Sequence, residues 1–110
     1  MRKPPVPLLQ GSLDLLVLGA LSTSPTHGYG IATLVRDRSS GALAIEDAAL
    51  YQALHRLERR GLVAAEWGLS DNNRRARFYE LTAEGRKRLR ADAASWRRYA
   101  QAVAAVIEGA

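Results

Sequence analysis

One amphipathic helix, with an alternating stretch directly after it, constrains the fold of this chain more than any other feature. Between Asp47 and Gly61, three leucines recur at the i, i+4, i+7 spacing that places them in one apolar stripe: Leu50, Leu54 and Leu57. Asp47 suits the N-cap of such a helix, and Gly61 suits the first residue beyond its end. The pattern predicts a helix with one face committed to a core.

The opposite face of this predicted helix carries residues that are small, aromatic or able to form hydrogen bonds. They are Ala48, Tyr51, Gln52, His55 and Arg59. A polar face opposite an apolar stripe is the side of a helix that stays outside the core. These side chains are therefore free to enter a groove of a partner.

The residues after this helix predict a two-stranded hairpin with a basic loop. Val63, Ala65 and Trp67 fall on one face of an alternating strand, and residues 78–81 alternate again. Between them, residues 70–77 read Ser-Asp-Asn-Asn-Arg-Arg-Ala-Arg. A two-stranded hairpin is marginal by itself, so it must lie on the helices. A helix that can enter a groove, beside a basic hairpin, suggests DNA as the partner.

The charge is concentrated near this hairpin. Residues 71–90 hold seven basic side chains against three acidic ones, so this stretch carries +4 of the net charge of +5. A basic patch of this kind indicates a polyanionic partner. The alternative is a solvated helix face without a partner.

The first half of the chain predicts two helices and a short strand. Three prolines make residues 1–7 an extended, flexible arm. A helix from residue 8 or 12 to 21 is apolar on more than one face, so we expect it to pack on a second subunit as well as on its own core. Residues 22–26 form a loop by composition, and a second helix covers residues 28–39. Residues 43–45 suggest a very short strand before the third helix.

The C-terminal third predicts one long helix from Thr82, a good N-cap, to about Ile107. Leu89, Trp96 and Val103 are spaced by seven residues and form an apolar seam. A helix of this length extends beyond so small a domain, and its seam needs a partner, for which a second copy of the chain is the first candidate. The alternative is that the helix folds back on its own core.

The sequence lacks the residues that several classes of protein need for their function. The chain has no cysteine, and its two histidines lie far apart in the sequence, so we expect no metal site and no cofactor. No nucleophile, base and metal set is present, so the chain is not expected to be an enzyme. No segment approaches the ~20 apolar residues of a membrane span. We expect a cytoplasmic protein with no membrane partner.

The order helix, helix, short strand, helix, hairpin, helix predicts a mainly α fold with a small β-hairpin: a winged helix-turn-helix domain plus a C-terminal dimerisation helix. Residues 1–7 are the arm, residues 8–81 the DNA-binding domain and residues 82–110 the dimerisation helix. In helix-turn-helix proteins the recognition helix lies in the major groove of DNA. Here the third helix would take that role, and residues 70–77 would form the wing.

The sequence resembles the PadR-like family of transcriptional regulators, in a short form, over residues 8–106. The resemblance rests on ordered blocks: Leu-Asp-Leu-Leu-Val-Leu at 13–18, His-Gly-Tyr-Gly-Ile at 27–31, Leu-Tyr-Gln-Ala-Leu-His-Arg-Leu-Glu-Arg-Arg-Gly-Leu at 50–62, Glu-Trp-Gly at 66–68, Asn-Asn-Arg-Arg-Ala-Arg-Phe-Tyr at 72–79 and Leu-Thr-Ala-Glu-Gly-Arg at 81–86. It implies a homodimeric winged-helix repressor whose C-terminal helix builds the dimer.

One block departs from the family pattern. The family usually opens the third helix with Gly-Ser-Leu-Tyr-Pro or Gly-Thr-Leu-Tyr-Pro, whereas this chain reads Ala48-Ala49-Leu50-Tyr51-Gln52. The hydroxyl that would contact a phosphate is lost at Ala49. Gln52 gains a side chain that can form hydrogen bonds with adenine.

These arguments give three sets of candidate residues. On the recognition helix, DNA contact is expected from Ala48, Ala49, Tyr51, Gln52 and His55. In the wing, it is expected from Asn73, Arg74, Arg75 and Arg77. The dimer interface is expected to include Leu9, Leu13, Leu89, Trp96, Tyr99, Val103 and Val106.

For several residues a structural role competes with a functional one. Tyr51 either contacts the DNA backbone or packs against the wing. Arg56 and Arg59 either contact DNA or pair with Glu58 and Asp47. His27 is expected to cap or pack at the start of the second helix, with phosphate contact as the alternative. Tyr29 is expected to pack in the core or at a helix junction.

Two functions from different classes follow. The first is a DNA-binding transcriptional regulator, a repressor that binds a pseudo-palindromic operator in double-stranded DNA as a homodimer. The second is a module that senses a small aromatic effector or binds another protein, with weak DNA binding. For the second, Trp96 would stack on the effector, whereas the competing role of Trp96 is to anchor packing in the dimer.

Overall fold

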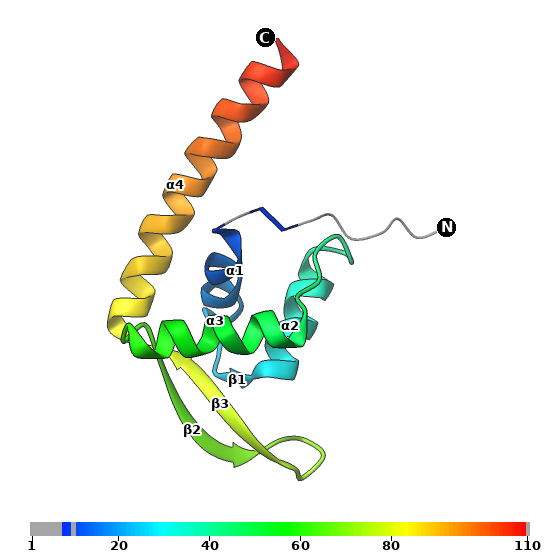
Figure 1. Ribbon diagram of the computed structural model, residues 1–110, viewed down its shortest axis with the longest axis vertical. Helices are drawn as coiled ribbons and strands as arrows, with labels where there is room; N and C mark the ends of the chain where they lie inside the picture. Colours follow the sequence, from blue (N-terminus) through cyan, green and yellow to red (C-terminus); the bar gives the residue numbers. More distant parts are fainter. Residues whose placement is uncertain (1–7, 10, 110) are drawn as a thin grey trace.

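The protein is described by a computed structural model over residues 8–9 and 11–109, so the predicted arm of residues 1–7 lies outside the described residues. The elements in chain order are α1 (Ser12–Ala20), β1 (Thr26–His27), α2 (Gly28–Arg38), α3 (Asp47–Arg59), β2 (Val63–Leu69), β3 (Arg75–Leu81) and α4 (Ala83–Glu108). The first three helices form a small body, from which α4 and the β2–β3 hairpin project in opposite directions (Figure 1). The predicted winged helix-turn-helix arrangement is confirmed.

The core forms around the apolar stripe of α3. Leu50, Leu54 and Leu57 are at most 1% exposed, and they pack with Val17 and Leu18 of α1 in one buried cluster. Full burial of each leucine contributes roughly 1.5–3 kcal/mol relative to exposure. The predicted stripe is therefore the element that holds the helices together.

The end of α3 was predicted correctly, but its start was not. Gly61 follows the helix with φ at +74°, and the N–H of Leu62 donates to the carbonyl of Leu57 at 2.9 Å, the closing bond of a Schellman motif. At the other end, Glu46 and not Asp47 is the N-cap residue. The reason is that the carbonyl of Glu46 already accepts from Leu50 at 2.9 Å, which makes Asp47 the first helical residue.

The sheet has three strands rather than the two that were predicted. Its order is β1-β3-β2, with β3 antiparallel to both neighbours, and Thr26 of β1 is paired with Tyr79 of β3. The short strand predicted at residues 43–45 is wrong, because Ile45 is buried in the core within an irregular segment. Residues 26–27 form the short strand instead, since they lie along the otherwise unpaired edge of β3.

The hairpin β2–β3, called the wing from here on, has longer strands than predicted. The two strands pair from Val63 with Leu81 to Leu69 with Arg75, so the loop shrinks to residues 70–74. Within it, the N–H of Ser70 donates to the carbonyl of Arg74 at 2.8 Å. The longer strands carry residues 75 and 77 away from the tip and onto a sheet face.

A junction of α3, β2 and α4 fixes where the last helix begins. Thr82 is the N-cap, as predicted: its side chain accepts from the N–H of Gly85 at 3.0 Å and donates to the carbonyl of Gly61 at 2.7 Å. The N–H of Thr82 also donates to the carbonyl of Leu62 at 3.1 Å. A Cβ on Gly85 would overlap that carbonyl, so only glycine fits. The start of α4 is therefore held tightly against the segment that joins α3 to β2.

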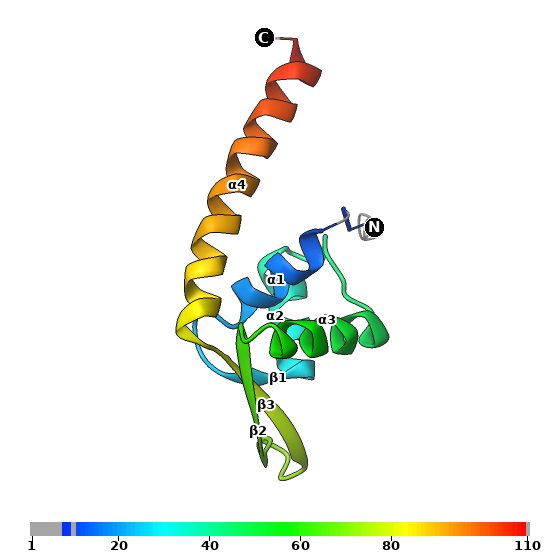
Figure 2. The same ribbon diagram turned by 60° about the vertical axis from the view of Figure 1, so that its left-hand side comes forward.

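Only the first half of α4 packs on the body. Leu89 lies against the core cluster, whereas the second half of the helix projects beyond it (Figure 2). The alternative in which α4 folds back on its own core is therefore wrong. Across residues 8–9 and 11–109, no helix combines the length and the apolar content that a bilayer crossing requires.

Candidate nucleic-acid interface

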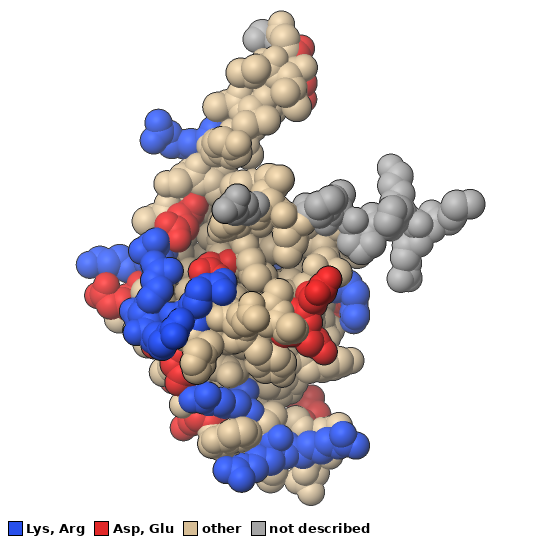
Figure 3. Space-filling model, viewed as in Figure 1, with Lys and Arg blue, Asp and Glu red and all other residues tan. Residues whose placement is uncertain are grey.

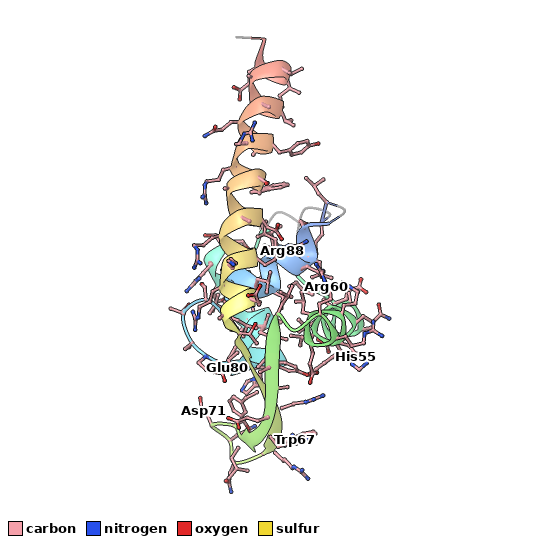
Figure 4. All side chains as sticks on the ribbon, turned by 90° about the vertical axis from the view of Figure 1, so that its left-hand side faces the viewer. His55, Arg60, Trp67, Asp71, Glu80 and Arg88 are labelled. Carbon is pink, nitrogen blue, oxygen red and sulfur yellow. The ribbon has the colours of Figure 1, made fainter. Side chains whose placement is uncertain are left out.

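The outward face of α3 is available to a partner, as its pattern predicts. Tyr51, Gln52 and His55 are exposed, as is Ala48 at the start of the helix, and Ala49 is half-buried. Figure 4 shows His55 directed away from the body. The same period that buries the leucines on one side therefore turns this face to solvent.

Tyr51 is held in place by a glycine of the neighbouring helix. A Cβ added to Gly28, the first residue of α2, would lie 2.7 Å from the hydroxyl oxygen of Tyr51. The ring therefore rests on the backbone at the start of α2, while the side chain keeps 53% of its surface exposed. This close packing positions the partly exposed Tyr51 side chain between α3 and α2.

At the start of α2, His27 has the role that was predicted, whereas Tyr29 does not. His27 is the N-cap: its Nδ1 accepts from the N–H of Gly30 at 3.0 Å, and its ring meets Phe78 edge-on. Tyr29, by contrast, is not in the core, because 75% of it is exposed. Ile31 takes the inward position of this turn, and the helical period directs Tyr29 outward.

The three wing arginines do not share one environment. Arg74 lies in the exposed loop, the guanidinium of Arg75 lies 4.5 Å from the centre of the Trp67 ring, and Arg77 donates to Glu58 of α3 at 2.8 Å. Residues 75 and 77 belong to β3 and share one face. The three arginines predicted in the loop of residues 70–77 are therefore spread along the wing, and Arg77 ties the wing to α3.

Arg77 also lies over the ring of Tyr79, with its guanidinium 5.9 Å from the ring centre. Burial raises the pKa of the Tyr79 hydroxyl above its usual value, although the charge of Arg77 opposes this shift. Tyr79 therefore stays neutral at physiological pH and adds no negative charge to the wing.

Arg56 forms an ion pair, but with a different partner from those considered in the sequence. Arg56 pairs with Asp14 of α1 at 2.7 Å rather than with Glu58 or Asp47, and Arg60 lies 3.9 Å from the same carboxylate. Residues two apart on a helix do not face each other, so Arg56 could not reach Glu58. One side of α3 is thus held to α1, and the other side is held to the wing through Arg77.

A groove of about 760 Å³ opens between the start of α2, the exposed Tyr51 and the wing. Its walls combine arginines with exposed aromatic rings, and Tyr29 and Trp67 are among them. The sequence did not predict that either residue would line this groove. For Trp67 a signal existed: it lies on the face of Val63 but four residues further out, beyond the reach of a small core. Basic side chains gather over the wing and around the start of α4 (Figure 3).

The residues expected at the dimer interface separate into two groups. Leu13 and Leu89 are half-buried against the chain's own core, whereas Leu9 is 58% exposed. The remaining members, Trp96, Tyr99, Val103 and Val106, all lie on α4 and are exposed. Among the described residues, no cluster of three or more His, Asp or Glu side chains is arranged to hold a metal ion.

Residues 17–91 match the profile of a family described as the transcriptional regulator PadR-like family. The chain is 26% identical over 103 residues to an uncharacterized protein of Lysinibacillus sphaericus, with 93% of this chain and 94% of that protein covered. A PadR family transcriptional regulator from Eggerthella lenta is 32% identical, with a TM-score of 0.75 over 92% of this chain and 86% of that one. A PadR family regulator from Clostridium difficile is 28% identical, with a TM-score of 0.73 over 88% and 98%.

The structure of Bacillus subtilis PadR in complex with operator DNA shares the fold. It is 20% identical to this chain, with a TM-score of 0.64 over 72% of this chain and 45% of that one.

Proposed function

Since the chain belongs to the PadR-like family of transcriptional regulators, we propose that it is a repressor that binds a pseudo-palindromic operator as a homodimer. The observation that carries this proposal is the exposed face of α3 beside an arginine-bearing wing. A helix with hydrogen-bonding side chains reads base edges, and arginines beside it contact phosphates. The complex of Bacillus subtilis PadR with operator DNA supports this use of the fold.

In this proposal α3 lies in the major groove and the wing lies on the adjacent backbone. Gln52 and His55 are the base-reading candidates, and Tyr51 contacts the backbone with its hydroxyl. Asn73, Arg74 and Arg75 supply affinity that does not depend on sequence, because neutralised phosphates release counterions. A two-fold dimer would place two copies of α3 about one helical turn of DNA apart, or a multiple of it.

The proposed dimer forms through the projecting half of α4. Trp96, Tyr99, Val103 and Val106 leave an apolar strip exposed on α4. Figure 1 shows that the C-terminal part of this helix projects beyond the body of the chain. A single chain that exposes such a strip gains stability by covering it with a second copy. Residues 8–81 then act as the DNA-binding domain and residues 82–110 as the dimerisation helix.

Two measurements test the proposed function together. Selection from a library of random duplexes should enrich an inverted repeat, and light scattering should give twice the mass of one chain. Enrichment of a single, non-repeated site by a monomeric protein would contradict the dimer and the operator geometry. If no duplex is retained at moderate salt, DNA binding itself is wrong.

Replacing Gln52 by alanine should change sequence preference with little change in affinity for unselected DNA. A bidentate amide contact with adenine discriminates against a wrong base by about 1–3 kcal/mol. The same library selection should therefore show relaxed preference at one base pair of each half-site. The matched control is Arg59→Ala on the same exposed face, which should leave the selected sequence unchanged. An identical selected sequence for Gln52→Ala would exclude base reading by this residue.

A second candidate function is sensing of a planar aromatic effector at Trp96, and a specific feature favours it. Trp96 is 39% exposed, and it lines two grooves of about 580 and 360 Å³ beside α4. In a Trp67→Phe background, titration with flat aromatic compounds should quench the remaining tryptophan to saturation. Quenching that stays linear with concentration would mean collision without a site.

A further inference from the structure

The two faces of the wing differ in chemistry. One face begins at the core with Val63 and Leu81 and continues outward through the cross-strand pairs Trp67 with Arg77 and Leu69 with Arg75. The opposite face carries the carboxylates of Glu66 and Glu80. Figure 4 shows Trp67 and Glu80 on opposite sides of the hairpin, with Trp67 on the side of α3. A polyanion is therefore attracted to one face only.

The favourable face exposes an unusual amount of apolar surface. Trp67 is 60% exposed and Leu69 is 65% exposed, because this part of the hairpin has no core that could bury them. The exposed ring of Trp67 still makes a contact, because the guanidinium of Arg75 lies 4.5 Å from the ring centre. A stacked guanidinium has lost part of its side-chain freedom before it meets a phosphate.

The face of the wing that carries Trp67 forms one wall of the groove, and α2 and α3 form the other. On the far wall, Tyr29 and Tyr51 present exposed rings with hydroxyl groups. The charged side chains that line the groove are Arg74, Arg75, Arg77 and, at the tip, Asp71. Apolar rings, hydroxyl donors and an excess of positive charge match a chain of alternating sugars and phosphates.

We propose that this groove holds the sugar–phosphate backbone of one DNA strand and that Trp67 is the positioning residue that aims Arg75 at a phosphate. The proposal rests on the proposed function, because it needs a duplex bound by α3 and the wing. It assigns roles to Trp67 and Tyr29, neither of which reads bases. Their contribution is to affinity that does not depend on sequence.

The first test follows Trp67 itself. The chain has two tryptophans, so Trp96→Phe leaves Trp67 as the only tryptophan emitter. When this variant is titrated with a fluorescently labelled duplex of random sequence, the anisotropy of the label should rise and the Trp67 emission should change. The two signals should have the same midpoint. A rise in anisotropy with unchanged Trp67 emission would overturn the groove placement while DNA binding stands. No rise in anisotropy for the unsubstituted chain would overturn the proposed function and this inference with it.

The second test separates positioning from direct contact. Trp67→Ala and Arg75→Ala should each weaken binding of the random duplex roughly fivefold, as expected for loss of one exposed ion contact. Each should lower the slope of log affinity against log salt by about one contact. The double variant should lose no more than either single variant, because Trp67 acts through Arg75. Additive losses would overturn the positioning role.

Matched variants guard this test against simple loss of folding. Trp67→Phe keeps a ring under the guanidinium and should restore most of the affinity and the salt slope. Glu66→Gln changes the neighbouring residue of β2 on the other face, and it should cause no loss. A Trp67→Phe variant as weak as Trp67→Ala, with native circular dichroism for both, would overturn the stacking argument.

Discussion

Replacing Arg74 and Arg75 together by alanine is expected to weaken binding to every duplex, whatever its sequence. The loss should be roughly 25-fold at moderate salt, since each exposed phosphate contact is worth roughly fivefold. The slope of log affinity against log salt should fall by about 1.8, because two fewer counterions are released. Anisotropy titrations of a labelled duplex at several salt concentrations measure both quantities. Sequence preference should persist, since the exposed face of α3 is untouched.

The control for this experiment removes the same charge elsewhere. Arg36 and Arg38 lie in the last turn of α2 and are both exposed. They do not line the groove. Their double alanine variant should bind with a nearly unchanged salt slope. If both double variants lose affinity equally, net charge and not the wing governs binding, and the phosphate role of Arg74 and Arg75 is wrong.

Placing glutamates at Val103 and Val106 is expected to abolish the dimer and, with it, operator binding. Both side chains lie on the projecting strip of α4, with 36% and 79% of their surface exposed in the single chain. In the proposed dimer they are buried, and burial of an unpaired carboxylate costs several kcal/mol. The dissociation constant of the dimer should therefore rise at least a thousandfold. Light scattering should report the mass of one chain, with native circular dichroism for the helices.

The matched control puts the same two charges on the other side of the helix. Gln101 and Ala105 are exposed and lie about 160° around the helix from Val103, at 100° per residue. A variant with glutamate at both positions should remain a dimer and keep its affinity. A dimeric Val103→Glu, Val106→Glu variant would rule out this strip as the interface. Two monomeric variants would point to helix disruption instead.

Local patterns in the sequence were sufficient for the elements that carry the site. The apolar stripe of α3, the positive-φ Gly61 and the Thr82 cap are all decided by residues within a few positions of each other, and all are found in the structure. The exposure of Gln52 and His55 follows from the same helical period. Their contacts with DNA remain predictions.

What the sequence could not provide depends on residues far apart in the chain. A strand of two residues has no pattern of its own, and β1 exists only because β3 offers it an edge. The pairs Arg56 with Asp14 and Arg77 with Glu58 join residues 42 and 19 positions apart. These pairs form because α3 packs on α1 and on the wing, and no local pattern in the sequence describes that packing. The groove wall at Tyr29 was missed for the same reason.

The junction at Thr82 has a consequence for which operators can be recognised. α4 has 26 residues, so it is about 39 Å long at ~1.5 Å per residue. A rotation of roughly 5° where it joins the domain displaces its far end by roughly 3 Å over this length. In the proposed dimer, such a rotation would change the distance between the two copies of α3 by a comparable amount. The spacing of half-sites is then set by the packing of Gly85 on Leu62, which are not among the residues proposed to contact DNA. Substitutions at this junction would retune the length of the operator while leaving its base sequence unchanged.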